Sequence, residues 1–361
     1  MRKLCYIMPE YNPRAHTHFA YLVDFIKEIS QRFEVFLIIE KGELPKEDWG
    51  CREVVLTKSP IKLFRQLRRA HRLHYRDFYV HYAFGAAFLA SLLVKWLGGR
   101  VFYWNCGLPW NYQRGWLRGK FEYKVYQMIN YLITGTEGMK RQYAEHYQLP
   151  LEKIRVMPNW TSSSKFQIPN SKFQIDELRK KLNIKPDQKV LFFAHRLSSR
   201  KGAQYLVPIL EAFKKENVVL LVAGDGPDRS RVDFKIIKFG LEEKVRMLGW
   251  VPNEELSSYF ELADVFLVPS EEEGFPHVIL EAMAYGAPFV AFAVGGVKEI
   301  IPADYQEMAV ASGNLSLFIE KIRQLLKLSR AERERRAEFG QHWVQRYRLE
   351  TVADIFKKIV S

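Results

Sequence analysis

The sequence predicts an α/β protein built from two doubly wound, Rossmann-like domains. Three observations lead to this prediction: the length of 361 residues, the alternation of short apolar runs with longer helical patterns, and a polar interval near the middle of the chain. A chain of this length suits two domains of roughly 150 to 200 residues each. Alternating strands and helices are typical of parallel sheets that carry helices on both faces.

The elements fall into two series. In the first, strands are expected at 4–8, 35–39, 78–81 and 101–104, and helices at 19–30 and 84–97. In the second, strands are expected at 190–194, 218–223, 245–248 and 265–269, and helices at 203–215, 228–239 and 253–262. Each series has the order of elements that forms one doubly wound sheet.

The interval between the two series, 158–189, is polar, contains Pro169 and Pro186 and holds one expected helix at 176–182. We place the linker there and expect an N-terminal domain at 1–165 and a C-terminal domain at 166–345. The last stretch, 346–361, is expected to contain a helix that could pack on either domain, including a return to the N-terminal one. Open parallel sheets bind ligands beyond the carboxyl ends of their strands, so functional residues should follow strands, in a cleft between two facing crevices.

Composition excludes several classes of protein. The longest apolar run, 84–94, falls short of the roughly 18 to 20 residues that span a bilayer. The N-terminal run 4–8 has the length of a strand rather than of a signal peptide, so we expect a cytoplasmic protein without a transmembrane helix. Cys5, Cys51 and Cys106 are odd in number and widely separated, which indicates neither a disulfide framework nor a zinc site.

Two loops after expected strands carry candidate phosphate-binding residues. Arg196 and Lys201 flank a short loop that enters a helix through Gly202, and two cations beside a helix N-terminus suit a diphosphate. In isolation such a pair is more often two solvated surface charges. The next strand ends in GDGPDR, where Gly226 permits close approach of a ligand to the backbone, although this stretch could be only a turn.

The segment EGFPHVILE, from Glu273 to Glu281, is the strongest signal in the sequence. A strand closes before it and a helix begins near Val278, so the backbone N–H groups of Gly274 to His277 can receive a phosphate. Glu281, one turn into the helix, can accept hydrogen bonds from both ribose hydroxyls. Glu273 lies on the order of 10 Å away, which would place one carboxylate on ribose and the other on a transferred sugar. An acidic turn that only stabilises the helix dipole would explain Glu273 alone.

Five stretches occur in one order along the chain: HRLSSRKG, VVLLVAGDGP, VRMLGWVPNEELSSYFELADVFLVPS, EGFPHVILEAMAYGAPFVA and GGVKEI. With them the sequence resembles the retaining glycosyltransferases of family 4 (glycosyl transferases group 1), which have the GT-B fold. The resemblance implies that the N-terminal domain is the acceptor side and that the C-terminal domain binds a nucleotide sugar. It also implies that no metal is needed.

The resemblance further implies a role for each site residue. Arg196 and Lys201 hold the donor diphosphate, Glu281 binds ribose and Glu273 contacts the donor sugar, so that Arg196, Lys201 and Glu273 form the catalytic group. The backbone around Trp250 and Val251 meets the nucleobase. The remaining donor-binding positions are expected to be Gly226, Gly274, Phe275, Pro276, His277 and Val278.

The N-terminal half departs from the family pattern at two loops. Ala15 to Thr17 stand where the family has a Gly-Gly pair, and Asn105 and Cys106 stand where a histidine commonly precedes Gly107. We therefore expect His16, His18, Asn105 and Cys106 to be candidate sugar or acceptor contacts and hypothesise an unusual donor. Isolated loop histidines are more often merely solvated, and Cys106 is more simply a packed, inert thiol than a nucleophile.

The positive charge is concentrated in the N-terminal half. Residues 1–165 contain 26 Lys and Arg against 14 Asp and Glu, or +12 of the total +14. The stretch from Lys58 to Arg76 contains seven basic residues and no acid, and the stretch from Trp110 to Phe121 combines aromatic and basic side chains. Both suit an anionic membrane interface, although an ordinary helix and loop on a basic protein fit equally well.

Together these features predict a glycosyltransferase that acts in polysaccharide or glycolipid synthesis, with a saccharide or lipid-linked acceptor and a peripheral place at the inner membrane face. Retention implies front-face transfer, in which the leaving diphosphate helps to deprotonate the acceptor. One alternative is an inactive, donor-binding partner subunit. A nucleic-acid binder is disfavoured because the basic half lacks a helix-turn-helix, RRM or zinc pattern.

Overall fold

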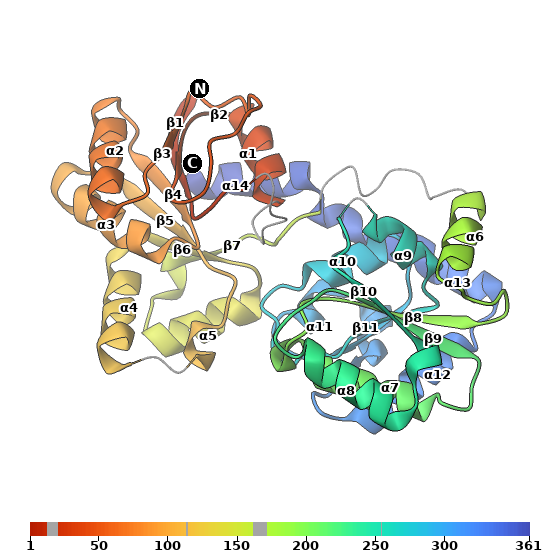
Figure 1. Ribbon diagram of the computed structural model, residues 1–361. Coiled ribbons are helices and arrows are strands. Elements are labelled where there is room, and N and C mark those ends of the chain that lie inside the picture. The colour runs from red at the N-terminus through yellow and green to blue at the C-terminus, as the bar shows by residue number, and fades with distance from the viewer. Residues whose placement is uncertain (13–20, 113–114, 162–171, 254) are drawn as a thin grey trace. The chain divides into compact units, whose positions relative to one another are not determined.

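The computed structural model of the chain describes residues 1–12, 21–112, 115–161, 172–253 and 255–361. The chain divides into two compact units (Figure 1). Met1–Ser162 and Arg348–Ser361 form the N-terminal domain, and Ser163–Tyr347 form the C-terminal domain. Among the described residues no helix combines the length and the apolarity needed to cross a bilayer.

The N-terminal domain is built on a seven-stranded parallel sheet with the strand order β3-β2-β1-β4-β5-β6-β7. The strands are β1 (Arg2–Met8), β2 (Phe33–Ile39), β3 (Glu53–Leu56), β4 (Asp77–His81), β5 (Arg100–Trp104), β6 (Tyr131–Thr134) and β7 (Ile154–Val156). The helices between them are α1 (Tyr21–Ser30), α2 (Pro60–Arg72), α3 (Phe84–Leu97), α4 (Trp116–Met128) and α5 (Glu137–Tyr147). The central strands are buried on both faces, as parallel sheets require.

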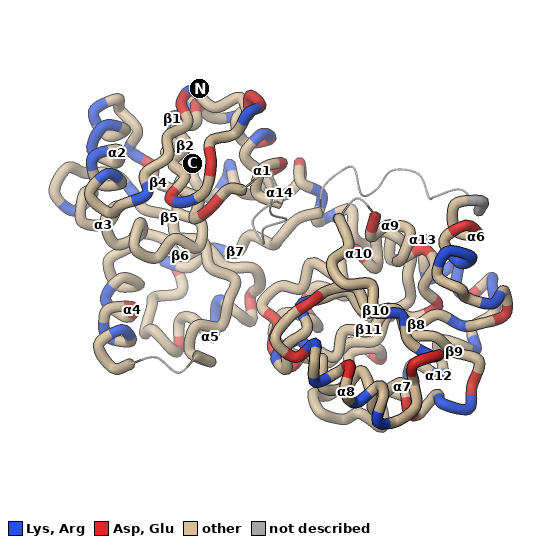
Figure 2. The backbone as a smooth tube through the Cα atoms, in the orientation of Figure 1, with Lys and Arg blue, Asp and Glu red and all other residues tan. Residues whose placement is uncertain are grey.

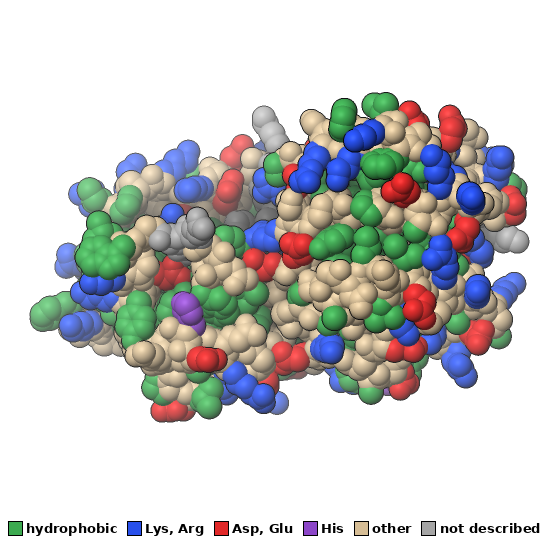
Figure 3. Space-filling model, turned by 90° about the horizontal axis from the view of Figure 1, so that it is seen from below, with side chains coloured by type: hydrophobic (Ala, Val, Ile, Leu, Met, Phe, Trp, Pro, Cys, Tyr) green, Lys and Arg blue, Asp and Glu red, His purple; other side chains and the backbone are tan. Residues whose placement is uncertain are grey.

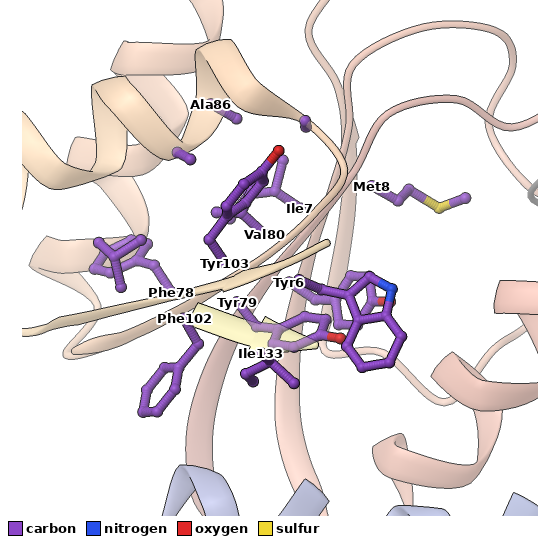
Figure 4. Close-up of a cluster of buried hydrophobic side chains, with 14 of the residues drawn as sticks. Tyr6, Ile7, Met8, Phe78, Tyr79, Val80, Ala86, Phe102, Tyr103 and Ile133 are labelled. Carbon is purple, nitrogen blue, oxygen red and sulfur yellow. The ribbon is translucent and has the colours of Figure 1, made fainter. Parts of the chain in front are cut away.

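The core of this domain is strongly aromatic. Tyr6 on β1 and Tyr79 on β4 are fully buried, with ring centroids 4.9 Å apart, and they lie together in the cluster shown in Figure 4. The hydroxyl groups of both face Nδ1 of His81 at 3.4 Å. A buried hydroxyl needs a hydrogen-bond partner, and the two tyrosines share Nδ1 of His81, at the end of β4, which makes one full hydrogen bond at a time.

The last helix, α14 (Leu349–Val360), completes the N-terminal core. Its Phe356 is buried and meets the rings of Phe25, Phe33 and Tyr79 at centroid distances of 4.9 to 5.7 Å. Arg100 donates a hydrogen bond to the carbonyl of Val360 (2.7 Å). The chain therefore leaves the N-terminal domain, forms the second domain and returns to the first.

The C-terminal domain has a six-stranded parallel sheet with the order β10-β9-β8-β11-β12-β13. Its strands are β8 (Lys189–Ala194), β9 (Val218–Ala223), β10 (Val245–Gly249), β11 (Val265–Val268), β12 (Phe289–Phe292) and β13 (Ala309–Val310). Its helices are α6 (Lys172–Lys181), α7 (Ala203–Ala212), α8 (Arg229–Phe239), α9 (Leu256–Leu262), α10 (His277–Ala284), α11 (Val297–Ile300), α12 (Leu315–Leu326) and α13 (Arg330–Val344). Buried apolar clusters lie on both faces of the sheet, and the prediction of two doubly wound, parallel α/β domains is confirmed.

Candidate functional site

The strand order of the C-terminal sheet creates a switch point between β8 and β11. After β8 the chain continues to β9 and β10 on one side, and after β11 it continues to β12 and β13 on the other. The loops that leave these two neighbouring strands therefore diverge and leave a crevice at the carboxyl edge of the sheet. The β8–α7 loop, with the short 3₁₀ helix η4 (Ser199–Lys201), and the β11–α10 loop, 269–276, begin there.

Two glycines allow the β11–α10 loop to pack closely against its neighbours, Gly202 in the β8–α7 loop and Gly295 in the β12–α11 loop. Gly202 has φ +82°, and a Cβ atom there would lie 2.0 Å from the carbonyl oxygen of Pro269 at the end of β11. Gly295 has φ +51°, and a Cβ atom there would lie 1.6 Å from the carbonyl oxygen of Glu273. Only glycine fits such positions, so Gly202 packs closely against Pro269 and Gly295 packs closely against the backbone of Glu273.

Lys201 and Glu273, both predicted site residues, meet in this crevice. The ammonium nitrogen of Lys201 lies 2.8 Å from Oε1 of Glu273, and the two side chains are only 14% and 6% exposed. Burial raises the pKa of Glu273, but the charge of Lys201, the electrostatic effect of His195, and hydrogen bonds from Lys201 and Ser270 lower it more, so its pKa is below the ordinary value. The carboxylate is therefore ionised and buried beside a cation.

The two acids before Glu273 have a different role. Glu271 accepts hydrogen bonds from the hydroxyl of Tyr205 (2.7 Å) and the amide of Gln204 (2.9 Å). Glu272 lies 3.5 Å from Arg200. These contacts fasten the acidic turn to the start of α7, so only Glu273 of the three is directed into the crevice beside Lys201.

Helix α10 directs its N-terminus to the same edge. It begins at His277, directly after Pro276, and has no side-chain cap. The positive end of the helix dipole and its first backbone N–H groups can therefore receive an anion. Glu281 lies one turn further along and is half-buried. Gly274 and Phe275 belong to the loop, Val278 to the first turn, and the carbonyl of Gly274 accepts a hydrogen bond from Gly296 (3.0 Å).

The other predicted donor contacts lie on neighbouring loops of the same edge. Gly226 is in the β9–α8 loop, which is fastened to the β8 loop because Asp228 N–H donates to the carbonyl of Leu197 (3.0 Å). Trp250 follows β10 and is 56% exposed, whereas Val251 is buried. Arg196 is exposed on the β8 loop. The predicted donor residues thus all follow strands of one sheet.

Sequence reasoning missed His195, which lies between β8 and Arg196. Its Nε2 is 3.8 Å from Oε1 of Glu273, the oxygen that Lys201 also approaches. The sequence could have indicated His195, because it directly follows β8, a central strand that borders the switch point. The family resemblance assigned roles to Arg196 and Lys201 of HRLSSRKG and none to His195.

The N-terminal candidates divide into described and undescribed residues. Asn105, directly after β5, is buried, donates to the Tyr126 hydroxyl (3.0 Å) and accepts from Gly107 N–H (2.8 Å). Burial raises the pKa of the Cys106 thiol well above its ordinary value, and a hydrogen bond with Thr134 offsets only part of this effect. These properties favour an inert thiol. His16 and His18 lie outside the described residues.

Two doubly wound parallel sheets, with polar loops gathered at the carboxyl edge of the second, define the GT-B class of proteins. A solved structure of HepE from Anabaena, in complex with UDP and glucose, has the same fold, with a TM-score of 0.83 at 18% identity over 100% of this chain and 99% of that one. Residues 174–343 match the family described as Glycosyl transferases group 1. The match covers the C-terminal domain, and it is to the family that the sequence resembles.

Curated relatives agree with the family. An uncharacterised glycosyltransferase of Methanocaldococcus jannaschii is 32% identical over 171 residues, which are 47% of this chain and 44% of that protein. The alpha-monoglucosyldiacylglycerol synthase of Streptococcus pneumoniae is 31% identical over 177 residues, 45% of this chain and 40% of the synthase. The chain thus spans less than half the length of these two relatives, and family 4 membership remains a prediction.

Proposed function

We propose that this protein is a glycosyltransferase that moves a sugar from a nucleotide diphosphate donor to a saccharide or lipid-linked acceptor. The observation that carries the proposal is the Lys201–Glu273 pair, buried at the switch point beside the uncapped N-terminus of α10. A cation and free N–H groups suit a diphosphate, and a buried carboxylate suits sugar hydroxyls. A domain of glycosyl transferases group 1 carries all of these groups.

The site residues act along the length of the donor. Arg196 and Lys201 neutralise the diphosphate, and Glu281 accepts the ribose hydroxyls from its place one turn into α10. Trp250 and Val251 meet the base, and Glu273 meets the sugar. When the glycosidic bond breaks, negative charge grows on the leaving diphosphate, and Lys201, Arg196 and the α10 dipole stabilise it without rearrangement.

We infer that transfer retains the configuration of the donor sugar by a front-face route, in which the leaving phosphate oxygen takes the acceptor proton. The raised pKa and burial of Cys106 support a route without a cysteine nucleophile. NMR of the product sugar tests this inference. The same anomeric configuration as in the donor is expected, and the opposite configuration would contradict front-face transfer.

The nature of the donor is testable with purified protein. HepE was solved with UDP and glucose, so we propose a uridine nucleotide sugar as the first candidate. In a thermal-shift panel of nucleoside diphosphates and their sugars, a bound ligand raises the unfolding temperature. We expect a UDP-sugar to give the largest rise and to be consumed with a cell-extract acceptor. Binding without consumption would favour an inactive donor-binding subunit instead.

We further propose that the N-terminal domain docks on an anionic membrane through a basic face formed by α2, α3 and α4, which pack side by side in this order (Figure 1). The exposed cations on these three helices are Lys62, Arg65, Arg68, Arg69, Arg72, Lys95, Arg118, Lys120 and Lys124, and Arg69 is paired with Glu53 on β3. The single acid on these three helices, Glu122, is buried and bonded to the Tyr147 hydroxyl (2.5 Å). Figure 2 shows the resulting concentration of basic residues along α2.

Large apolar side chains accompany these cations. Trp96 and Leu97 at the end of α3 are 80% and 50% exposed, and Trp116 and Leu117 at the start of α4 are 69% and 73% exposed. Seen from below, the end of this domain that carries α4 and α5 presents hydrophobic side chains interspersed with Lys and Arg (Figure 3). Aromatic residues among cations suit the headgroup region of an anionic bilayer.

Flotation with vesicles of neutral and anionic lipids tests the docking surface. We expect binding to anionic vesicles that falls with salt, and loss of most binding in Arg65→Glu/Arg68→Glu. The matched control is Lys180→Glu/Lys181→Glu on α6, where both lysines are exposed on the other domain; it makes the same change in net charge. Equal losses in the two variants, or no binding by the wild type, would refute the basic face.

A further inference from the structure

His195 has a fixed position at the end of β8. Its backbone N–H donates to the carbonyl of Ala223 at the end of β9 (3.1 Å). Its own carbonyl lies against Gly224, where a Cβ atom would approach that oxygen to 2.0 Å. The backbone of His195, at the end of β8, is therefore fixed against the end of β9, and its side chain leaves from the carboxyl edge of the sheet.

The hydrogen bonds of the imidazole ring define where its proton lies. The backbone N–H of Arg196 donates to Nδ1 of His195 (2.8 Å). A neutral imidazole that accepts at Nδ1 carries its proton on Nε2. Nε2 is the atom that faces Oε1 of Glu273 at 3.8 Å, so the ring presents an N–H group to the carboxylate.

Among the described residues, the charged groups near His195 come from three loops. Glu273 approaches from the β11–α10 loop, and Lys201 lies 2.8 Å from the same carboxylate oxygen. Asp225, in the neighbouring β9–α8 loop, accepts from the backbone N–H of Gly226 (2.6 Å). Arg196, the next residue in the chain, is exposed. The Glu273 carboxylate is therefore flanked by one permanent cation and one imidazole.

We propose that His195 is a positioning residue of the donor site. Its Nε2–H group lies 3.8 Å from Oε1 of Glu273, which is beyond hydrogen-bond distance, and orients the carboxylate by electrostatic attraction. This inference rests on the proposed function, in which Glu273 contacts the donor sugar. Lys201 then serves two partners, because it also neutralises the diphosphate. When a bound nucleotide sugar draws the Lys201 ammonium toward its phosphates, the N–H group of His195 still faces Glu273. The Glu273 carboxylate therefore keeps its orientation toward the sugar.

The first experiment measures the ring itself and does not depend on activity. Nitrogen-15 NMR of the full chain, with His195 assigned by a His195→Asn variant, reports which ring nitrogen carries the proton. We expect the neutral ring to be protonated on Nε2, and we expect Glu273→Gln to move the midpoint of the His195 titration to lower pH because it removes the facing negative charge. A proton on Nδ1, or an unchanged midpoint, would overturn the proposal.

The second experiment separates positioning from binding. His195→Leu should lower kcat by about tenfold or more, because small displacements of a substrate contact are costly, and should leave the Kd for UDP within about twofold. His195→Gln retains an N–H group at similar reach and should recover most of the loss. Equal rates for the two variants would overturn the proposal. If the wild type transfers no sugar, the proposed function fails, and the NMR result still decides the role of His195.

Discussion

Replacing Lys201 by Met should expose how strongly the candidate site depends on its buried ion pair. The substitution keeps the length of the side chain and removes its charge, which leaves Glu273 with a carboxylate that is 6% exposed and lacks its cation. Breaking a buried pair from one side costs about 3 to 5 kcal/mol. We expect about 3 kcal/mol, at the lower end, because Lys201 retains some exposure and His195 lies 3.8 Å from the same oxygen.

A double-mutant cycle measures this cost. In a domain of this size, 3 kcal/mol corresponds to a fall of about 6 to 12 °C in unfolding temperature, measured by calorimetry of the full chain. Glu273→Gln removes the buried charge, so in its background Lys201→Met should cost less than about 1 kcal/mol. Equal costs in both backgrounds would show that the pair has no energetic role and would refute the reasoning.

The same pair predicts a direction of pH dependence. The pKa of Glu273 is lowered in the folded protein, so the carboxylate stabilises the fold above its unfolded pKa, about 4.3. That contribution is lost as pH falls through the folded pKa. The stability advantage of the wild type over Glu273→Gln should therefore shrink below about pH 4. An advantage that grows on acidification would contradict the assigned sign.

Three further predictions concern the same edge of the sheet. Gly202→Ala should yield little folded protein or lower the unfolding temperature by about 10 °C or more, because its Cβ atom would lie 2.0 Å from the Pro269 carbonyl; a melt like that of the wild type would contradict the packing. Glu281→Ala should weaken UDP binding by about tenfold and leave pyrophosphate binding unchanged in calorimetry, because Glu281 is proposed to bind the ribose. Equal losses of affinity for UDP and pyrophosphate would contradict a ribose contact at Glu281. Chelation with EDTA should leave transfer unchanged, and loss of activity restored by a divalent metal would show that a metal is needed.

Much of the fold was predictable because parallel strands are long apolar runs. The expected strand 190–194 matches β8, and 218–223 matches β9, since both are buried in the middle of the sheet. Five short strands were missed: β3, β6, β7, β12 and β13. Strands of two to four residues carry little periodic signal. Helix α7 ends at Ala212, before the expected 215, where Phe213 turns into the core.

The location of Lys201 and Glu273 at one edge of the sheet could be predicted, because both residues follow strands in the sequence. Two aspects depend on packing and could not be read from the sequence. Glu271 and Glu272 look equivalent to Glu273 in the sequence, and only the contacts with Tyr205 and Arg200 separate them. At Cys106 the sequence favoured a packed thiol only from the general behaviour of cysteine, and the extent of its burial depends on tertiary structure.

The most direct test of the account is calorimetric titration of UDP into the wild type and into Arg196→Ala. Arg196 is exposed, so its replacement should leave the fold intact and change only the ligand site. We predict measurable UDP binding by the wild type and a loss of at least about tenfold, or about 1.4 kcal/mol, in the variant. Equal affinities, or a wild type that binds no nucleoside diphosphate, would contradict the assignment of this edge as the donor site.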